Sequence, residues 1–284
     1  MTPKKIDRVR ALAKINLTLR VLGVRRDGYH ALETTFQSLA LHDTLTIRAV
    51  RGPFRITCDD PSCPTDRRNL VWRAAARVWR ASGRRGAPRG AAVHIAKRIP
   101  MQAGLGGGSS DAAAALRALG RRWRVGESEL RRIAASLGAD VPYFFEGGTV
   151  LGVERGDLLF RLSDHPAAWV VLVLPAFGVS TKDAYGWFDK DNKVVGRAFQ
   201  ASRGANDLQA PVARRHPGIA RLVRALRRRG AHLAAMSGSG SAVFGLFRRR
   251  PQALRAARAL ASASRRTAVT RTVGRAGYRR LVGN

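Results

Sequence analysis

The sequence has few cysteines and no long apolar run. Its two cysteines, Cys58 and Cys63, lack further Cys or His residues at zinc spacing, so a zinc site is not expected. A small loop disulfide stays open, but free thiols are favoured. The longest apolar stretch, residues 167–177, contains a proline and is shorter than the roughly 18 residues that indicate a membrane span. The basic first ten residues lack the apolar segment of a secretory signal. We therefore expect a cytoplasmic protein without membrane association.

Acidic residues are also scarce, at 19 against 52 lysines and arginines, which gives a formal net charge of +33. Such an excess can indicate a nucleic-acid-binding protein. However, 45 of the 52 basic residues are arginines spread along most of the chain, and no RNA-binding motif accompanies them. A compositional preference for arginine explains this pattern. We expect no specific nucleic-acid partner, and a basic RNA-binding protein remains an alternative.

The order of apolar patterns predicts an α+β fold. Alternating or β-branched patterns predict strands at residues 9–21, 31–41, 43–50, 91–99, 147–153, 169–175 and 268–273, with another after residue 241. Helical spacing predicts helices from Asn69, as the cap, to 81, and at 110–119, 128–137, 180–188, 216–229 and 251–264. Residues 190–202 are predicted to be irregular. Because strands and helices do not alternate strictly, α+β is favoured over a doubly wound sheet. We place a domain boundary after residue 160, which gives domains 1–160 and 161–284.

A glycine-rich loop after Pro100 joins a predicted strand to a predicted helix. Glycines let backbone amides approach an anion, and a helix start adds unpaired N–H groups with partial positive charge. Two serine hydroxyls at its end are suited to phosphate or Mg²⁺. The loop is neither a Walker A loop nor a protein-kinase glycine loop. We predict a nucleotide-phosphate cradle rather than a flexible turn whose serine caps the helix; its residues are Gly104, Leu105, Gly106, Gly107, Gly108, Ser109 and Ser110.

A second small-residue turn, containing Gly238, Ser239 and Gly240, is a weak signal alone. Either it is an ordinary hairpin turn, or it faces the same polyanionic ligand as the first loop. Asp140 lies before a proline-containing turn and is a candidate general base, with a turn-capping role as the alternative. Lys14 lies inside an apolar strand, where an ammonium needs a partner such as Asp140 or a phosphate unless the strand is an exposed edge.

An aromatic residue and an imidazole, Tyr29 and His30, follow a turn at Asp27-Gly28. Together they are suited to stacking on, and hydrogen bonding with, a planar base. A simple surface turn is the alternative. No nucleophile motif accompanies His30, so catalytic histidine chemistry is poorly supported.

Taken in order, these motifs resemble the GHMP kinase superfamily, and within it the kinases whose acceptor carries a cytidyl group. The resemblance runs from Ala13-Lys-Ile-Asn-Leu, through Arg26-Asp-Gly-Tyr-His, Pro100 to Ala115 and Gly138-Ala-Asp-Val-Pro, to Ser237-Gly-Ser-Gly-Ser. It implies transfer of the ATP γ-phosphoryl group to the 2-hydroxyl of a cytidine-diphosphate-linked methylerythritol, in the non-mevalonate isoprenoid precursor pathway. The implied fold has two lobes, an N-terminal lobe of the ribosomal-protein-S5 type and a ferredoxin-like C-terminal lobe.

The resemblance also implies residue roles. Asp140 matches the catalytic base, Lys14 the cation paired with it, and Asn16 a substrate contact near the reacting hydroxyl. His30 matches the reader of the cytosine edge, while Tyr29 and, less directly, Tyr185 match aromatic residues on its two faces. The expected ATP contacts are Asn69, Leu70 and Lys97 around the adenine, with Pro100 and the glycine loop along the phosphates, and Ser110 is the expected Mg²⁺ ligand.

We therefore expect a monomeric or homodimeric enzyme whose partners are ATP, Mg²⁺ and a small cytidyl substrate. The alternative within the superfamily is another small-molecule kinase, of the homoserine or mevalonate class. Tyr29 and His30 disfavour it, because such acceptors contain no planar base.

Overall fold

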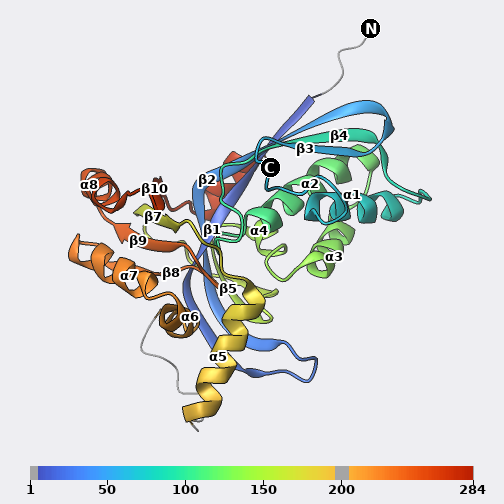
Figure 1. Ribbon diagram of the computed structural model, residues 1–284. Helices are drawn as coiled ribbons and strands as arrows, with labels where there is room; N and C mark the ends of the chain where they lie inside the picture. Colours follow the sequence, from blue (N-terminus) through green and yellow to red (C-terminus); the bar gives the residue numbers. More distant parts are fainter. Residues whose placement is uncertain (1–5, 196–204, 284) are drawn as a thin grey trace.

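Two β-sheets organise the chain in the computed structural model, which describes residues 6–195 and 205–283 (Figure 1). The first sheet has the order β3-β4-β2-β5-β6, and β1 pairs along β2. Its strands are β1 (Ile6–Val24), β2 (His30–Pro53), β3 (Arg55–Cys58), β4 (Arg89–Ala96), β5 (Thr149–Glu154) and β6 (Leu158–Arg161). The long antiparallel pair of β1 and β2 runs through the middle of the molecule (Figure 1).

The two strands predicted at residues 31–41 and 43–50 form one continuous strand, β2. No glycine or proline interrupts the chain between them, so the backbone has no reason to turn there. Asp43, at the start of the second predicted strand, is buried within β2, and its Oδ1 accepts hydrogen bonds from the backbone N–H groups of Arg98 and Ile99 at 2.5 and 2.7 Å.

Helices cover the first sheet and form its core: α1 (Leu70–Ala81), α2 (Gly107–Trp123), α3 (Glu127–Leu137) and the short α4 (Tyr143–Glu146). Asn69 caps α1 as predicted, because its Oδ1 accepts a hydrogen bond from Val71 N at 2.9 Å. The alanines of α2 are buried against β1 and α1. Small side chains therefore bring the start of α2 close to the central strands.

The second sheet has the order β10-β7-β9-β8 and is antiparallel throughout. Its strands are β7 (Trp169–Pro175), β8 (Leu233–Met236), β9 (Val243–Phe247) and β10 (Arg265–Arg271), and its helices are α5 (Thr181–Val195), α6 (Gln209–Arg215), α7 (Gly218–Arg228) and α8 (Arg250–Leu260). A helical stretch follows β7 and α8 follows β9, so the lobe has the ferredoxin-like βαββαβ order. The predicted two-lobed α+β fold is confirmed.

The sequence patterns missed some elements. The short strands β3 and β6 and the helix α6 were not predicted, and neither was α9 (Arg275–Val282). The helix predicted at residues 180–188 continues to Val195, so the expectation of irregular backbone is wrong for residues 190–195. The remainder of that segment, 196–202, lies outside the described residues. The domain boundary after residue 160 stays a prediction.

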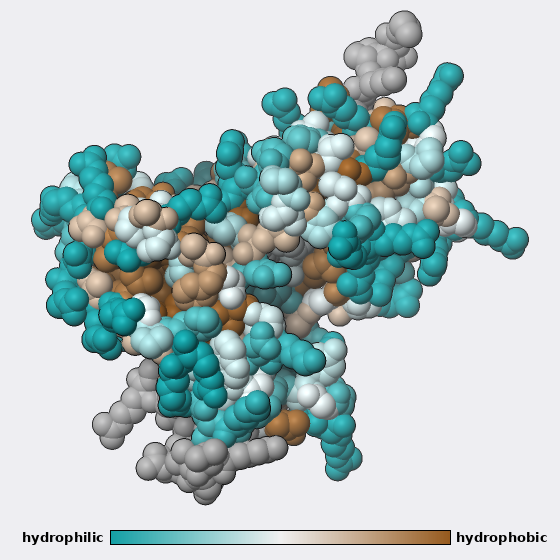
Figure 2. Space-filling view, viewed as in Figure 1, coloured by the Kyte–Doolittle hydropathy of each residue, from teal (hydrophilic) through white to brown (hydrophobic). Residues whose placement is uncertain are grey.

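The last helix, α9, joins the C-terminal part of the chain to the first lobe. Tyr278 is buried, and its hydroxyl donates to Phe144 O at 2.6 Å. Tyr278 and Val282 also pack with Leu12 of β1. In the view of Figure 2, hydrophilic side chains cover much of both lobes, and apolar side chains gather toward the middle of the C-terminal lobe. Among the described residues, no helix combines the length and apolar character needed for a membrane crossing.

Candidate active site

A cavity of about 1030 Å³ contains most of the residues predicted to bind ligands. Its walls come from β1, the start of β2, the glycine loop, the turn after β8 and the start of α5. The predicted residues that line it are Lys14, Asn16, Tyr29, His30, Leu70, Pro100, Gly104, Leu105, Gly106, Gly107, Gly108, Ser109, Asp140, Tyr185, Gly238 and Ser239. Motifs that are distant in the sequence therefore meet at one site.

The glycine loop ends in the first turn of α2. Gly106 precedes the helix with φ +72° and no side-chain cap, so the first amides of α2 are available to an anion. A Cβ at Gly106 would lie 2.8 Å from Phe144 and 3.0 Å from the Lys14 side chain. Leu105 O accepts a hydrogen bond from Lys14 N at 3.0 Å. The loop is thus fixed against β1, directly beside Lys14.

The two glycine turns touch each other. Ser237 Oγ donates to Gly104 O at 2.9 Å, and Ala242 N donates to Ala103 O at 3.2 Å. Gly104 has φ +74°, and a Cβ there would lie 2.1 Å from Ser237 O. The second turn is therefore more than a hairpin connection, because it closes the cavity against the first loop.

Lys14 and Asp140 form the ion pair predicted for them, with 3.3 Å between Nζ and Oδ2. The Lys14 side chain is 4% exposed, whereas the Asp140 side chain is 35% exposed and faces the cavity. Lys14 Nζ also donates to Asn16 Oδ1 at 2.7 Å, and Asn16 Nδ2 donates to Thr34 Oγ1 at 2.7 Å. The Lys14 ammonium is thus fixed by buried hydrogen bonds, and the carboxylate of Asp140 paired with it is open to a ligand.

In the same cavity, His30 stacks on Tyr185, with ring centroids 4.7 Å apart and planes at 26°. His30 Nε2 lies 2.8 Å from Asp189 Oδ1. Tyr29 is 59% exposed, and the guanidinium of Arg155 lies over its ring at 5.4 Å from the centroid. An imidazole and two aromatic rings therefore border the same cavity as the glycine loop.

Comparison with known proteins shows similarity to named kinases over most of the chain. The family described as GHMP kinases N terminal domain matches residues 69–148, and the family described as GHMP kinases C terminal matches residues 189–265. The chain is 40% identical to the 4-diphosphocytidyl-2-C-methyl-D-erythritol kinase of Moorella thermoacetica, covering 93% of this chain and 98% of that protein. It is 42% identical to the kinase of the same name from Pelotomaculum thermopropionicum, covering 92% and 96%.

The chain belongs to the 4-diphosphocytidyl-2-C-methyl-D-erythritol kinase family of the GHMP kinases. A crystal structure of 4-(cytidine 5'-diphospho)-2C-methyl-D-erythritol kinase aligns with a TM-score of 0.79 at 34% identity, covering 94% of this chain and 100% of that one. The mevalonate kinase of Methanococcus jannaschii aligns with a TM-score of 0.70 at 13% identity, covering 96% and 99%, which shows the shared fold alone. The predicted membership of the GHMP kinases is confirmed.

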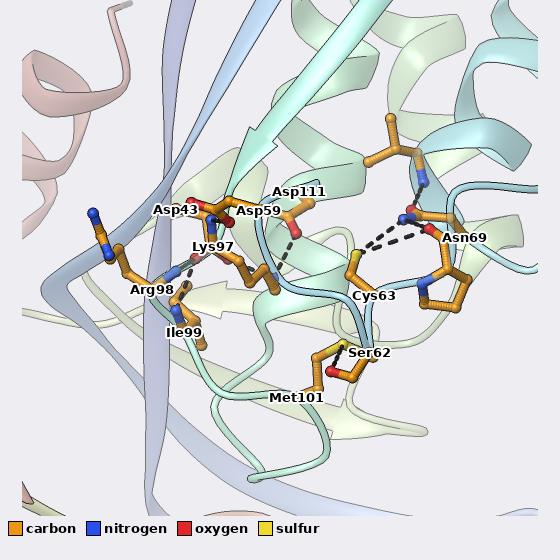
Figure 3. Close-up of polar contacts among 12 residues, drawn as sticks. Asp43, Asp59, Ser62, Cys63, Asn69, Lys97, Arg98, Ile99, Met101 and Asp111 are labelled. Carbon is orange, nitrogen blue, oxygen red and sulfur yellow. Dashed lines mark hydrogen bonds and ion pairs between the residues drawn. The ribbon is translucent and has the colours of Figure 1, made fainter. Parts of the chain in front are cut away.

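Within this GHMP kinase, three residues predicted to bind ATP or metal do not line the cavity. Asn69 uses its side chain to cap α1, and its Nδ2 donates to Pro64 O at 2.6 Å. Ser110 is 1% exposed, and its Oγ has no hydrogen-bond partner among the described residues. Lys97 points into the protein instead (Figure 3). Gly240, in the second turn, also lies outside the cavity lining. The ligand contacts expected of these residues stay predictions.

Lys97 is the centre of a buried triad with Asp43 and Asp111, near Gly107 at the start of α2 (Figure 3). Its Nζ lies 2.5 Å from Asp43 Oδ2 and 2.7 Å from Asp111 Oδ2. Burial lowers the pKa of Lys97, but the two carboxylates outweigh this and leave the pKa above its ordinary value. Burial, together with the nearby Asp43 charge, raises the pKa of Asp111 to about 7 against the pull of Lys97. The triad connects β2, the residue that follows β4, and the N-terminal part of α2, so it helps to fix the helix start that adjoins the glycine loop.

The two cysteines are free thiols in the loop before α1 and at the end of β3. Burial raises the pKa of the Cys63 thiol to about 12, and Asn69 Nδ2 lies 3.5 Å from its sulfur (Figure 3). A thiol with so high a pKa is a poor nucleophile. The prediction of free thiols is confirmed.

Sequence reasoning missed two polar residues beside the cavity. Asn206 is 3% exposed, and its Nδ2 donates to Met236 O and Gly238 O, both at 2.8 Å. It therefore holds the second glycine turn. Asp189 holds His30. The Asn-Asp pair at residues 206–207 was the sequence feature that could have drawn attention to Asn206. For Asp189, the feature was its position four residues after Tyr185, which places both side chains on one face of a helix.

Proposed function

We propose that the chain catalyses transfer of the γ-phosphoryl group of ATP to the 2-hydroxyl of 4-diphosphocytidyl-2-C-methyl-D-erythritol, a step in the supply of isoprenoid precursors by the non-mevalonate pathway. The observation that carries the proposal is the Lys14–Asp140 pair. It lies in one cavity together with a glycine-rich helix start and the His30–Tyr185 stack. Relatives at about 40% identity carry the name of this kinase.

The donor phosphates would lie along Gly104 to Ser109, where backbone amides and the start of α2 offer positive charge. Pro100 and Leu70 line the cavity next to the loop and would border the remainder of ATP. The adenine contacts assigned to Asn69 and Lys97 would have to come from their backbone, since both side chains are engaged elsewhere.

Mg²⁺ would neutralise charge on the transferring phosphates when bound. The described residues contain no group of three or more carboxylate, His or Cys side chains suited to a metal, so most ligands would be phosphate oxygens and water. Ser110 is the residue that fits a Mg²⁺ site. Its buried Oγ lacks a hydrogen-bond partner among the described residues and would coordinate the ion.

Asp140 would accept the proton of the attacking 2-hydroxyl, and Lys14 would keep Asp140 in place and stabilise the developing charge. Asn16, which is fixed by Lys14 and Thr34, would contact the acceptor near that hydroxyl. His30 would read the cytosine edge, and Tyr29 and Tyr185 would pack against the ring. Phosphoryl transfer needs alignment and charge neutralisation more than covalent help, which this set provides.

The same proposal includes the cellular location and the oligomeric state of the enzyme. We place the enzyme in the cytoplasm, which the free thiols Cys58 and Cys63 support. It would act as a monomer or homodimer with ATP and the cytidyl acceptor as its partners.

The test measures ADP release with ATP, Mg²⁺ and the cytidyl acceptor, for the unmodified protein and Asp140→Asn. The substitution preserves the shape of the side chain but removes the base. We expect turnover to fall at least about 100-fold while ATP still binds. Near-normal turnover in Asp140→Asn would refute the assigned base, and turnover with homoserine or mevalonate in place of the cytidyl acceptor would refute the substrate.

A further inference from the structure

The surroundings of His30 contain a carboxylate that the proposed reaction does not use. His30 is the first residue of β2, directly after the turn at residues 25–28, and its side chain is 12% exposed. Three residues of α5 contact it. Tyr185 stacks on one face, Phe188 meets it edge-on with centroids 6.4 Å apart, and Asp189 Oδ1 lies 2.8 Å from Nε2.

These three residues are spaced i, i+3 and i+4, so they share one face of α5. The ring plane of His30 is fixed by the two aromatic contacts, and its rotation within that plane is fixed by the carboxylate. Asp189 lines the cavity, and its side chain is 36% exposed. The arrangement therefore orients an imidazole toward a ligand.

The hydrogen bond also selects which ring nitrogen carries the proton. An ionised carboxylate only accepts hydrogen bonds, so the proton of a neutral His30 lies on Nε2. The second nitrogen, Nδ1, forms no hydrogen bond with any residue in the described parts of the chain, and His30 lines the cavity. In this tautomer Nδ1 offers a lone pair and accepts a hydrogen bond.

We infer that Asp189 is a positioning residue that sets base specificity: by holding the proton on His30 Nε2, it makes Nδ1 an acceptor for the exocyclic amino group of cytosine. Cytosine presents an amino donor at the position where uracil presents a carbonyl acceptor. A lone pair on Nδ1 attracts the amino group of cytosine and repels the carbonyl oxygen of uracil. The inference rests on the proposed function, because it assumes that a cytidyl acceptor binds at His30.

The kinetic test compares the unmodified protein with Asp189→Asn and Asp189→Ala, using the cytidyl acceptor and its uridyl analogue. We expect the KM for the cytidyl acceptor to rise about tenfold, the loss of one oriented hydrogen bond, with kcat at saturation unchanged. The preference for cytidyl over uridyl acceptor should narrow by a similar factor. Asp183→Asn removes the same charge from an exposed position of α5 that does not line the cavity, and it should leave both quantities unchanged.

A second readout needs no substrate. In protein labelled with ¹⁵N-histidine, the ring-nitrogen signals of His30 should report a protonated Nε2 and an unprotonated Nδ1. Asp189→Ala should shift the two signals toward a mixture of tautomers. If Nδ1 carries a proton in the unmodified protein, or if Asp189→Ala changes neither signal, the inference is wrong.

Failure of the inference and failure of the proposed function give different results. If the unmodified protein phosphorylates the cytidyl acceptor and the Asp189 variants keep its KM and base preference, only the role of Asp189 is refuted. If the unmodified protein phosphorylates no cytidyl acceptor, the proposed function and the cytosine-reading role fall together, and the nitrogen signals still decide whether Asp189 selects the tautomer.

Discussion

Replacing Gly104 with alanine adds one methyl group at the point where the two glycine turns touch. Gly104 has φ +74°, a conformation that costs a residue with a Cβ about 1–2 kcal/mol. The new Cβ would also lie 2.1 Å from Ser237 O and 3.2 Å from Gly240 N, so backbone must move. Movement would break the hydrogen bonds from Ser237 Oγ to Gly104 O and from Ala242 N to Ala103 O, each worth about 1 kcal/mol.

The sum predicts that Gly104→Ala lowers the free energy of unfolding by about 3–4 kcal/mol. The matched control is Gly86→Ala, because Gly86 has φ +73° but no atom lies within 4 Å of the position that its Cβ would take. Gly86→Ala should lower the free energy of unfolding only by the cost of positive φ, about 1–2 kcal/mol. Urea denaturation gives both values, provided that the dependence of the free energy on urea concentration is the same in each variant.

The same two variants separate function from stability. Below the unfolding transition, Gly104→Ala should raise the KM for ATP, since the phosphate loop loses its contact with the second turn, whereas Gly86→Ala should not. Equal stability losses in the two variants, with unchanged KM for ATP, would show that the contact between the turns does not shape the phosphate site.

Three further predictions follow from buried polar groups. The pKa of Asp111 is raised from 3.8 to about 7 in the folded state, so the folded state binds this proton more tightly than the unfolded state does. The free energy of unfolding should therefore fall as pH rises from about 4 through 7. In urea titrations at several pH values, Asp111→Asn should lose this dependence on pH. Lys97→Met leaves two buried carboxylates without their cation and should cost about 3–5 kcal/mol by the same method, and a loss under about 1 kcal/mol would contradict the role of the triad. Asn206→Ala frees the carbonyls of Met236 and Gly238 and should lower kcat/KM about tenfold, while an unchanged kcat/KM would show that the second turn needs no support from Asn206.

The ion pair between Lys14 and Asp140 was predictable because local sequence made both residues conspicuous. Lys14 stands among apolar residues of a strand, where an ammonium needs a partner, and Asp140 stands in a turn between apolar residues. The glycine loop was predictable for a similar reason, since a strand, adjacent glycines and a helix start form one continuous segment. In both cases the chemistry can be read within a few neighbouring residues.

The supporting residues were not predictable in this way, because their partners are distant in the sequence. Asp189 contacts a histidine 159 positions earlier, and Asn206 contacts a turn about 30 positions later. The family resemblance placed Lys97 near the adenine, but its partners Asp43 and Asp111 become visible only when β2, β4 and α2 are packed together. The single strand β2 was divided in the prediction because its apolar pattern changes between residues 41 and 43, and the contacts of Asp43 with the N–H groups of Arg98 and Ile99 are not visible in the sequence.

The most direct test of the central claim is a single-turnover measurement with γ-labelled ATP, Mg²⁺ and 4-diphosphocytidyl-2-C-methyl-D-erythritol. The proposed function predicts that the label appears on the 2-hydroxyl of the acceptor with the unmodified protein, and that Asp140→Asn transfers it at least about 100-fold more slowly. Release of labelled phosphate without labelled acceptor, or equal rates for the two proteins, would contradict it.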